Sequence, residues 1–581
     1  MRINIVKSKN SEQVYIIKSF RKNGKSTSSI FKKLGKMEDL LKLHNNNREE
    51  VIAWANRQAK YYTDKENEDN LDVVLNLSQS KQIEKDTNTL FNGGYLFLKD
   101  IFYDLKLDKI CDTVASRNKA TYNLSHILEI LIFSRILNPC SKLSSYEYAH
   151  GLIEKPDYDI QHVYRALSAL IKEDDFIQSA IYKNSTKVVD RNTSVLYYDC
   201  TNYFFEIEQA HEDKRYGMSK EHRPNPIVQM GLFLDGNGIP LAFNITPGNA
   251  NEQTTLKPSE EKIIRDFQLS KFVVCTDAEL ASKANRKFNN MANRSYVVTQ
   301  SLKTIKDFLK DWALDPEGWN CGKETGIDLR QVDEFGTGEI DEETKKKMYS
   351  RVFHKERWIN EDGLEQRLIV TYSQKYRDYQ RNIRSGQIER ATKMAKKNNP
   401  SKKKKKNDPA RFLKEINTTE NGEVASEFYT SLDQEAIDKE AKFDGFYGVC
   451  TTLKDDVSEI IKINQRRWEI EESFRIMKTE FKARPVYLER QDRIKAHFLV
   501  CYLSLVVFRI LEKKLSEKYT AGTLIKTLRS MNFKYYTGYG YVPTYTRTNL
   551  TDELHDIFGF RTDTQIVSEK NMKKIIKKVR S

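Results

Sequence analysis

Apolar positions recur at three- and four-residue steps between residues 95 and 187, which is the period of helices that bury one face. Short β-type runs follow at five places, residues 193–206, 226–235, 239–246, 271–277 and 295–303. Helical stretches separate the last three runs, so the pattern predicts three strands, a helix, a strand, a helix and a strand. The segment Asp-Gly-Asn-Gly at 235–238 is a hairpin signal between the second and third strands.

The segments on either side of this α/β pattern differ in composition. Two β-type runs flank the turn signal KNGK at 22–25, and the apolar signal weakens after residue 303, where five consecutive lysines at 402–406 must be solvated. The predicted segments are an N-terminal β-hairpin and polar helical region (1–90), a helical domain (91–190), two parts of an α/β core (191–303 and 444–515), an inserted β-rich subdomain with a basic loop (304–443) and a C-terminal appendage (516–581).

The charge of the chain indicates the kind of partner. Its 581 residues include 97 Lys and Arg against 82 Asp and Glu, a net charge of +15. This excess favours a polyanion, with nucleic acid first, because basic side chains release condensed counterions when they bind it. Solubility of a Lys-rich protein is the alternative. Within 91–190, a helix-turn-helix DNA reader and a plain helical scaffold share the same period, so both stay open.

The cysteines and apolar runs indicate the compartment. Seven cysteines stand apart without a CxxC pair, which indicates neither a disulfide framework nor a zinc site and fits a reducing cytoplasm. The N-terminal residues lack the apolar core of a signal peptide. The most apolar run, 498–508, is too short to span a bilayer and continues into Arg509, so a buried helix is expected.

Two aspartates occupy strand positions where a charge needs a reason. Asp199 lies within an apolar and aromatic run, on the same strand face as Tyr197 and Thr201. Asp277 follows a short apolar strand and precedes a helix. Taken singly, Asp199 could face solvent and Asp277 could be a helix N-cap. Taken together, carboxylates at strand ends of an α/β sheet are typical of ligand and metal sites.

A late amphipathic helix at 463–485 contains four glutamates. On a wheel of about 100° per residue, one apolar stripe is formed by four residues, Ile470, Phe474, Met477 and Phe481. The wheel places Glu469, Glu472 and Glu480 on the solvated side. It places Glu471 at the edge of the buried face.

Arg467 and Lys478 lie on the same side of this wheel as Glu471. One interpretation is an ion-pair ladder along the helix surface. The other is a third metal ligand flanked by two phosphate-binding cations, because hard divalent ions combine carboxylates with phosphate oxygens. Two such ions about 4 Å apart can activate a water and stabilise a leaving oxygen.

The two aspartates and the spacing Arg467-x3-Glu471-x6-Lys478 resemble the DDE transposases of bacterial insertion sequences, in particular the branch with a Tyr-x2-Arg-x3-Glu-x6-Lys signature. Four further stretches extend the resemblance, at 135–143, 231–256, 444–452 and 483–497, so that it covers most of the chain from about residue 90 to 515. Asn464 stands where the signature has Tyr. An Asn side chain hydrogen-bonds a phosphate but cannot stack on a base or a sugar.

The resemblance implies a ribonuclease H-like catalytic core, a mixed sheet flanked by helices, with a β-rich insertion and a preceding helical domain. It implies two ions of Mg²⁺ or Mn²⁺. The implied catalytic residues, which also bind the metal ions, are Asp199, Asp277 and Glu471. The implied DNA-binding residues are Arg467, Lys478 and Asn464. The motif does not place the family's base-stacking Trp, and Trp312 and Trp319 are expected to pack in a core.

The implied function is that of a cytoplasmic, nucleoid-associated bacterial protein. It would bind the terminal inverted repeats of its own element as a homodimer, cleave phosphodiesters and join the 3′ hydroxyl ends to target DNA, with or without a hairpin intermediate. The segment 1–90 is then a candidate for DNA-end binding. The segment 91–190 is a candidate for DNA binding or dimerisation. Neither a membrane nor a small-molecule substrate is expected.

Two alternatives stay open at this stage. One is a metal-dependent nuclease or resolvase on the same fold, which cuts DNA without joining it. The other is a non-catalytic DNA-binding protein derived from a transposase. The presence of all three carboxylates argues against the second alternative.

Overall fold

The computed structural model describes residues 1–8, 11–22, 25–69, 73–75, 77–80, 82–334, 342–361, 363–396, 408–418 and 424–580. The chain divides into two compact units, Met1–Thr87 and Asn88–Ser581. The expected lysine loop at 402–406 and the turn residues 23–24 lie outside the described residues.

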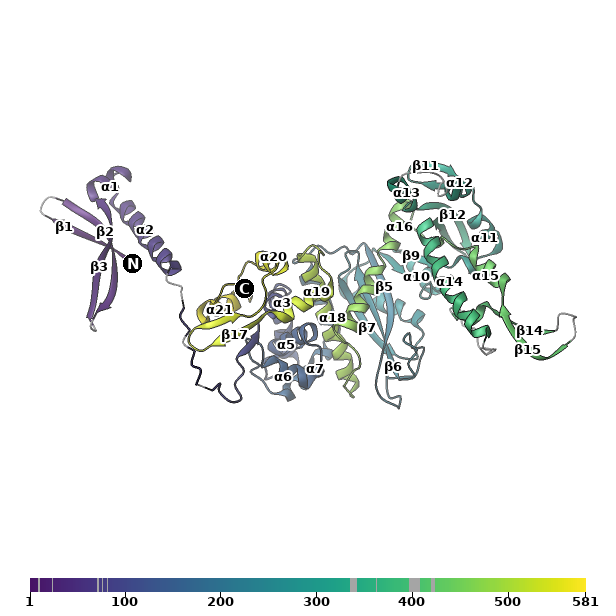
Figure 1. Cartoon of the computed structure of the whole chain (residues 1–581), viewed down its shortest axis with the longest axis horizontal. Helices are drawn as coiled ribbons and strands as arrows, with labels where there is room; N and C mark the ends of the chain where they lie inside the picture. The colour runs from purple at the N-terminus through teal and green to yellow at the C-terminus, as the bar shows by residue number, and fades with distance from the viewer. Residues whose placement is uncertain are drawn as a thin grey trace. The chain divides into compact units, whose positions relative to one another are not determined.

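The first unit is a three-stranded antiparallel sheet with two helices (Figure 1). Its elements are β1 (Arg2–Ser8), β2 (Ser11–Lys22), β3 (Lys25–Lys36), α1 (Met37–Leu43) and α2 (Arg48–Asp69). A small core forms where Val14 of β2 meets Met37, Leu40, Val51 and Ala55 of the helices. Strands β2 and β3 pair up to Lys22 opposite Lys25.

The second unit is a mixed α/β structure built on a ten-stranded sheet. The elements that follow one another from residue 195 are β5 (Val195–Phe204), β6 (Ile227–Asp235), β7 (Pro240–Pro247), α9 (Leu256–Phe267), β8 (Val273–Thr276), α10 (Lys283–Asn289) and β9 (Ser295–Gln300). This confirms the predicted order of strands and helices. Strands β5, β6 and β7 are antiparallel neighbours, whereas β8 and β9 run parallel to β5.

Both faces of this part of the sheet are covered, which explains the near-continuous apolar runs of its strands. In β5, Tyr197 and Tyr203 belong to the main core, whereas Tyr198 and Cys200 face a second core formed with α9. All of β6 is buried. Because alternate side chains of β5 enter two different cores, the strand is held rigidly on both sides.

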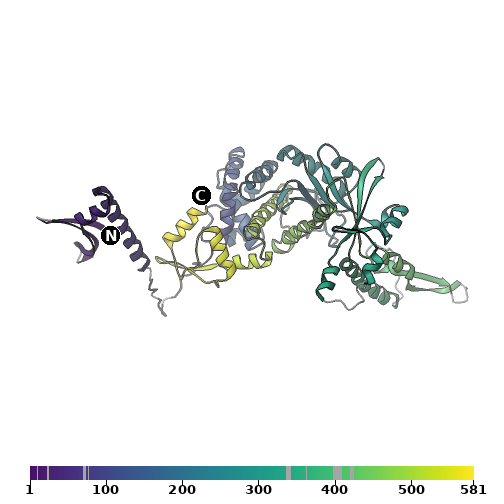
Figure 2. The same cartoon turned by 90° about the horizontal axis from the view of Figure 1, so that it is seen from above.

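The inserted residues continue the same sheet. Strand β16 (Phe446–Thr451) pairs with β9, and the sheet then extends through β13, β12, β10 and β11. The elements between β9 and β16 are α11 (Asp307–Leu314), β10 (Trp319–Cys321), β11 (Glu324–Ile327), α12 (Leu329–Glu334), α13 (Glu342–Tyr349), β12 (Phe353–Glu361), β13 (Leu364–Tyr372), α14 (Gln374–Lys396), β14 (Leu413–Thr418), β15 (Val424–Leu432) and α15 (Gln434–Ala441). Strands β14 and β15 form a separate hairpin, seen at the end of this segment in Figure 2.

Helices cover the other end of the unit. They are α3 (Tyr95–Asp104), α4 (Leu107–Arg117), α5 (Leu124–Leu137), α6 (Lys142–Ala149), α7 (Ile160–Lys172), α8 (Asp174–Ser185) and the late helix α18 (Gln491–Lys514). The late helices α16 (Val457–Gln465) and α17 (Trp468–Arg475) instead contact the sheet strands β9 and β5. Helix α18 packs against α3, α5 and α7 on one side and β7 on the other (Figure 1). It is the one described helix long and apolar enough to cross a membrane, but 94% of its apolar window is buried inside the protein. The predicted buried helix is therefore confirmed.

The last residues of the chain join the first residues of this unit. They form α19 (Ala521–Ser530), β17 (Asn532–Tyr536), β18 (Gly540–Pro543), α20 (Asn549–Phe558), β19 (Val567–Ser568) and α21 (Glu569–Lys578). Strand β17 pairs with β4 (Leu90–Asn92), with Phe533 opposite Phe91. Residues more than 400 positions apart thus share one four-stranded sheet.

Candidate active site

Two carboxylates lie next to each other at neighbouring parallel strands, Asp199 within β5 and Asp277 directly after β8. In the pairing of β5 with β8, Tyr197 is opposite Cys275. Asp199 and Asp277 each lie two residues further along, where equal steps keep two side chains on the same face of a parallel pair. The structure therefore brings the two predicted aspartates together.

The surroundings of Asp199 disfavour its charged form. Burial raises the pKa of this carboxyl to about 6, and the neighbouring Asp277 adds to the rise, while Lys220, the Cys200 N–H and Arg467 oppose it. The Cys200 N–H donates to Asp199 Oδ1 at 2.7 Å. A pair of carboxylates in this environment favours a bound cation, because a positive charge relieves their mutual repulsion.

Asp277 is not the N-cap of the following helix. Its Oδ1 accepts the N–H of Glu279, but α10 begins only at Lys283 and is capped by the Ser282 hydroxyl, which accepts the N–H of Asn285. The N-cap interpretation of Asp277 is thus wrong, because the chain makes a separate turn before the helix starts.

Arg467 connects the late helix to this carboxylate pair. Its Nη2 lies 4.0 Å from Asp277 Oδ2 and 3.5 Å from Glu471 Oε1. Its Nη1 donates to the Thr299 hydroxyl at 2.8 Å, and this hydroxyl also bonds the Tyr447 hydroxyl at 2.7 Å. The guanidinium of Arg467 therefore lies between the carboxylates of Glu471 and Asp277.

The late helix is not the single regular helix that the wheel assumes. Helix α16 ends at Gln465, α17 begins at Trp468, and residues Ile476–Glu480 form a π-helical segment, η5. The predicted apolar stripe is nevertheless buried, and Ile476, which the wheel omits, is buried too. A π segment turns less per residue than an α-helix, so every position after Arg475 is rotated relative to the wheel.

The structure reverses the predicted exposure of Glu469 and Glu471, because Glu469 is buried and Glu471 is exposed. The side chain of Glu471 is 63% exposed, whereas Glu469 as a residue is only 6% exposed. Burial raises the pKa of Glu469, and the nearby Lys513, Arg466 and Arg509 oppose this rise. The prediction of a solvated Glu469 is therefore wrong, because the hairpin between β6 and β7 covers this side of α17.

Replacing Gly238 by Ala should lower the free energy of unfolding by about 1–2 kcal/mol more than replacing Gly318 by Ala. The two glycines have matched left-handed backbones, with φ of +77° and +78°. A Cβ at 238 would lie 1.5 Å from Glu469 Oε2, whereas a Cβ at 318 would meet no atom within 4 Å. Chemical denaturation measures both losses, and equal losses would contradict the burial of Glu469 against the hairpin.

Lys478 lies at the site but not in the predicted ladder. Its Nζ donates to the Thr201 hydroxyl at 2.7 Å and lies 3.5 Å from Glu221 Oε1. Burial lowers its pKa, and the cations Arg484 and Lys220 add to the decrease, while Glu221 opposes it. The ladder is thus correct only for Arg467 and Glu471, since the π segment directs Lys478 toward β5.

Two site residues, Lys220 and Glu221, were not identified from the sequence. Lys220 donates to the Cys200 carbonyl at 2.5 Å and lies 3.3 Å from Glu252 Oε2. Its charge acts on Asp199, and the adjacent Glu221 contacts Lys478. The signal that could have found Lys220 and Glu221 is the charged run at 219–223 in a loop between two strands, because loops at strand ends carry functional residues.

The remaining residues named from the sequence are Asn464 and the two tryptophans Trp312 and Trp319. Asn464 lies in the last turn of α16, where its carbonyl accepts the N–H of Arg467 at 3.3 Å. Its side-chain oxygen is buried and has no hydrogen-bond partner among the described contacts. Trp319 is fully buried, and Trp312 packs against the same core, as expected.

The fit of a metal ion to these residues is partial. Among the described residues, no three His, Cys, Asp or Glu side chains are grouped closely enough to hold an ion. Asp199 and Asp277 fit a divalent cation by their chemistry and their mutual repulsion. Glu471 would have to turn away from Arg467, which its exposure permits.

Two neighbouring aspartates beside an arginine-held glutamate, on a mixed sheet, form an arrangement that suits metal-dependent phosphate chemistry. Residues 203–507, more than half of the chain, match the family model of the transposase DDE domain. The chain belongs to this family, whose members cleave DNA and transfer strands and in general use divalent metal ions. The matched range includes Asp277, Arg467, Glu471 and Lys478 and begins just after Asp199.

Two solved structures are similar to the chain at low identity. One is a synaptic complex of the piggyBac transposase with hairpin DNA, at 8% identity, with a TM-score of 0.33 over 85% of this chain and 81% of that chain. The other is a paired-end complex of the Mos1 transposase with the left transposon end, at 11% identity, with a TM-score of 0.14 over 42% of this chain and 66% of that chain. No curated protein sequence matches the chain significantly.

Proposed function

We propose that the chain is the transposase of a bacterial insertion sequence and that Asp199, Asp277 and Glu471 are its catalytic residues. The single observation that carries this proposal is the contact of Arg467 with both Asp277 and Glu471, beside the strand that holds Asp199. It gathers three carboxylates that are separated by 272 positions of sequence into one region. The family membership supports the same reaction class.

We also propose that the core is ribonuclease H-like. The strand order β7-β6-β5-β8-β9, with three antiparallel strands followed by two parallel ones, agrees with that fold. Asp277 then lies directly after the carboxyl end of β8, beside Asp199 in the middle of β5. The carboxyl ends of strands are where open α/β sheets bind ligands. The proposal includes the branch with the Tyr-x2-Arg-x3-Glu-x6-Lys signature, whose spacing Arg467, Glu471 and Lys478 match.

In the proposed mechanism, Asp199 and Asp277 together with Glu471 hold divalent ions, Mg²⁺ or Mn²⁺. Two such ions, when bound, activate the attacking oxygen and stabilise the leaving oxygen of a phosphodiester. Arg467 and Lys478 bind the flanking phosphates and keep the scissile bond in line. Lys220 limits the rise of the pKa of Asp199, so that the carboxylate form is available near neutral pH.

The proposed substrates are the terminal inverted repeats of the element and a target duplex, held by a homodimer. The test uses labelled duplexes with the sequences that flank the gene, incubated with the full chain and Mg²⁺, Mn²⁺ or EDTA. Metal-dependent cleavage followed by joining to a target plasmid is expected. Cleavage without joining would indicate a nuclease or resolvase, and binding without cleavage would indicate a DNA-binding derivative.

Replacing Lys478 by Met should lower the slope of log Kd against log salt for DNA binding by about one. The reason is that one phosphate contact with its released counterion is lost. The control is Lys462→Met, because Lys462 is an exposed residue of α16 paired with Glu459. Fluorescence anisotropy over a salt series measures the slope. An unchanged slope would show that Lys478 contacts Thr201 and Glu221 but does not bind a DNA phosphate.

A further inference from the structure

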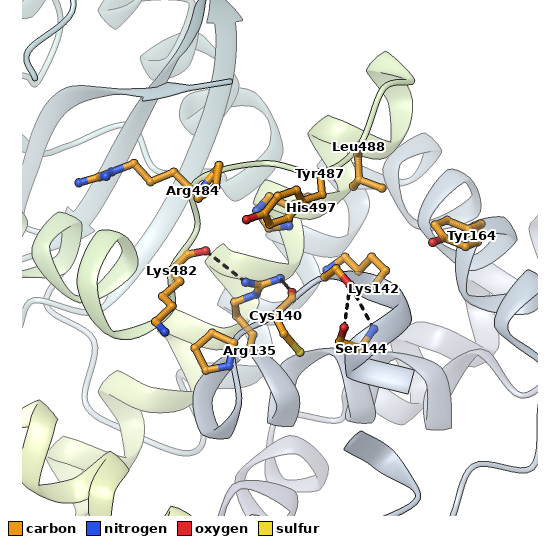
Figure 3. A pocket seen from close by; sticks show the side chains of 13 residues that line it. Arg135, Cys140, Lys142, Ser144, Tyr164, Lys482, Arg484, Tyr487, Leu488 and His497 are labelled. Atoms are coloured by element: carbon orange, nitrogen blue, oxygen red, sulfur yellow. Dashed lines mark hydrogen bonds between the residues drawn. The ribbon is translucent and has the colours of Figure 1, made fainter. Parts of the chain in front are cut away.

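A cavity of about 430 Å³ lies where the helical region meets the turn after the late helix (Figure 3). Its wall comes from the end of α5 and the start of α6, from residues 482–488 and from α18. The lining residues are Arg135, Pro139, Cys140, Ser141, Lys142, Ser144, Tyr164, Lys482, Arg484, Pro485, Tyr487, Leu488 and His497. Four of them are Lys or Arg and none is Asp or Glu, so the wall is positively charged.

Lys142 is the unexplained residue in this wall. It is only 5% exposed, and its Nζ has no hydrogen-bond partner among the described contacts. Burial lowers its pKa to about 7, and the neighbouring Arg135 adds to the decrease. A buried ammonium group without a partner is strongly unfavourable, so this position is costly unless an anion reaches it.

Arg135 has a different role, because both of its terminal nitrogens already donate to carbonyl oxygens, while its buried Nε has no partner among the described contacts. It donates to the carbonyl oxygens of Phe481, Lys482 and Cys140 at 3.1, 3.4 and 3.2 Å. These bonds hold the turn after η5 against α5. Lys482 itself has a left-handed backbone with φ of +45°, and its exposed side chain lies at the cavity. The ammonium groups of Lys142 and Lys482 are therefore the available cations.

The remaining groups of the wall also suit an anion. The hydroxyls of Ser141 and Ser144 line the cavity at the N-terminal end of α6, where the helix dipole is positive. Two aromatic residues, Tyr164 and Tyr487, line the same cavity, and Tyr487 is 68% exposed (Figure 3). Phosphate oxygens accept from ammonium and hydroxyl donors, and an exposed ring can stack on an adjoining nucleoside.

We propose that this cavity binds a phosphate group through Lys142 and Lys482. The neighbouring contacts indicate a source in the DNA backbone. Arg484 lines the cavity, yet its Nε lies 3.0 Å from Glu221, which is 3.5 Å from Lys478 at the candidate active site. Its guanidinium also lies over the Phe204 ring at the end of β5. A strand that passes the active site can thus continue into the cavity. The DNA source rests on the proposed function, whereas the phosphate site does not.

The test compares the full chain with Lys142→Met, using inorganic phosphate and labelled DNA as separate probes. Isothermal titration calorimetry with inorganic phosphate is expected to show binding that Lys142→Met weakens at least about tenfold. For DNA, the slope of log Kd against log salt is expected to fall by about one. Lys183→Met is the control, because Lys183 is an exposed residue of α8. Lys482→Gln, at an exposed position, is a second variant that does not disturb the buried wall.

The two probes distinguish the sources of the phosphate. Changes with both probes support a DNA phosphate, and a change with inorganic phosphate alone supports a site for a free phosphate. Both results are independent of whether the chain cleaves DNA, so a failed cleavage assay leaves them interpretable. Unchanged binding of both probes in both variants, with circular dichroism that shows folded protein, would overturn the proposal.

Discussion

Replacing Asp199 by Asn should lower DNA cleavage by about 1,000-fold or more while the protein stays folded. The carboxylate lies on a central strand beside Asp277 and is proposed to hold a metal ion, a role that an amide fills poorly. The fold should tolerate the change, because burial raises the pKa of Asp199 to about 6 and so disfavours its charged form. Cleavage of a labelled element end and thermal unfolding measure the two effects.

The matched control for this variant is Asp311→Asn. Asp311 is an exposed residue of α11 in the inserted segment, and the same change of charge there should leave cleavage within about twofold of the unaltered protein. If Asp199→Asn cleaves DNA normally, Asp199 is not a catalytic residue. If Asp199→Asn fails to fold, the fold needs the carboxylate of Asp199, because the Asn oxygen can still accept the Cys200 N–H.

Replacing Glu471 by Gln should lower cleavage at least about 100-fold, whereas replacing the adjacent Glu472 should change it less than about twofold. Glu471 faces Arg467 and, through it, Asp277, while Glu472 is paired with Arg475 on the same helix. An exposed pair one turn apart stabilises a helix by only about 0.5 kcal/mol. Loss of the Glu471–Arg467 pair alone therefore cannot explain a large loss of activity.

Parallel cleavage assays and denaturation curves of the two variants decide between the roles of Glu471. Large loss of cleavage with unchanged stability supports a metal ligand. Equal activity of the two variants would show that Glu471 only forms a surface ion pair with Arg467. Another carboxylate would then be the third metal ligand.

The pair of aspartates could be predicted because its cause is local. Alternating side chains place Asp199 on one face of its strand, and the short apolar run before Asp277 is a strand that ends at Thr276. The hairpin of β6 and β7 and the helix α9 then connect β5 to the parallel strand β8, and the sequence pattern shows all three elements. For the same reason the order of strands and helices along this part of the chain was predicted correctly.

The glutamates of the late helix could not be assigned in this way. A wheel assumes one regular helix with a single buried face, but the chain breaks between α16 and α17 and widens into the π segment η5. Two surfaces cover α17, the hairpin at Gly238 and Arg509 of α18, which donates to the Glu469 carbonyl at 3.1 Å. Burial of Glu469 therefore depends on residues more than 200 positions upstream and 40 positions downstream.

Lys220 and the phosphate cavity show the same dependence on distant partners. Lys220 acquires its role only because the loop after β5 brings it to Asp199, and Lys142 becomes an unpaired buried cation only where α6 meets the turn at 482–488. No spacing within either segment reveals such a contact, because each partner comes from a different part of the fold.

By itself, the sequence determined the strand and helix order of the core, the position of Asp199 within a strand and of Asp277 directly after one, and the buried helix α18. Each of these follows from the periodicity of one segment. Only the tertiary structure decided which glutamate of α17 is exposed, that Lys478 bonds Thr201 and Glu221, and that Arg467 joins Asp277 to Glu471. Those contacts depend on which surfaces pack together, and packing between distant segments leaves no periodic signal in the chain.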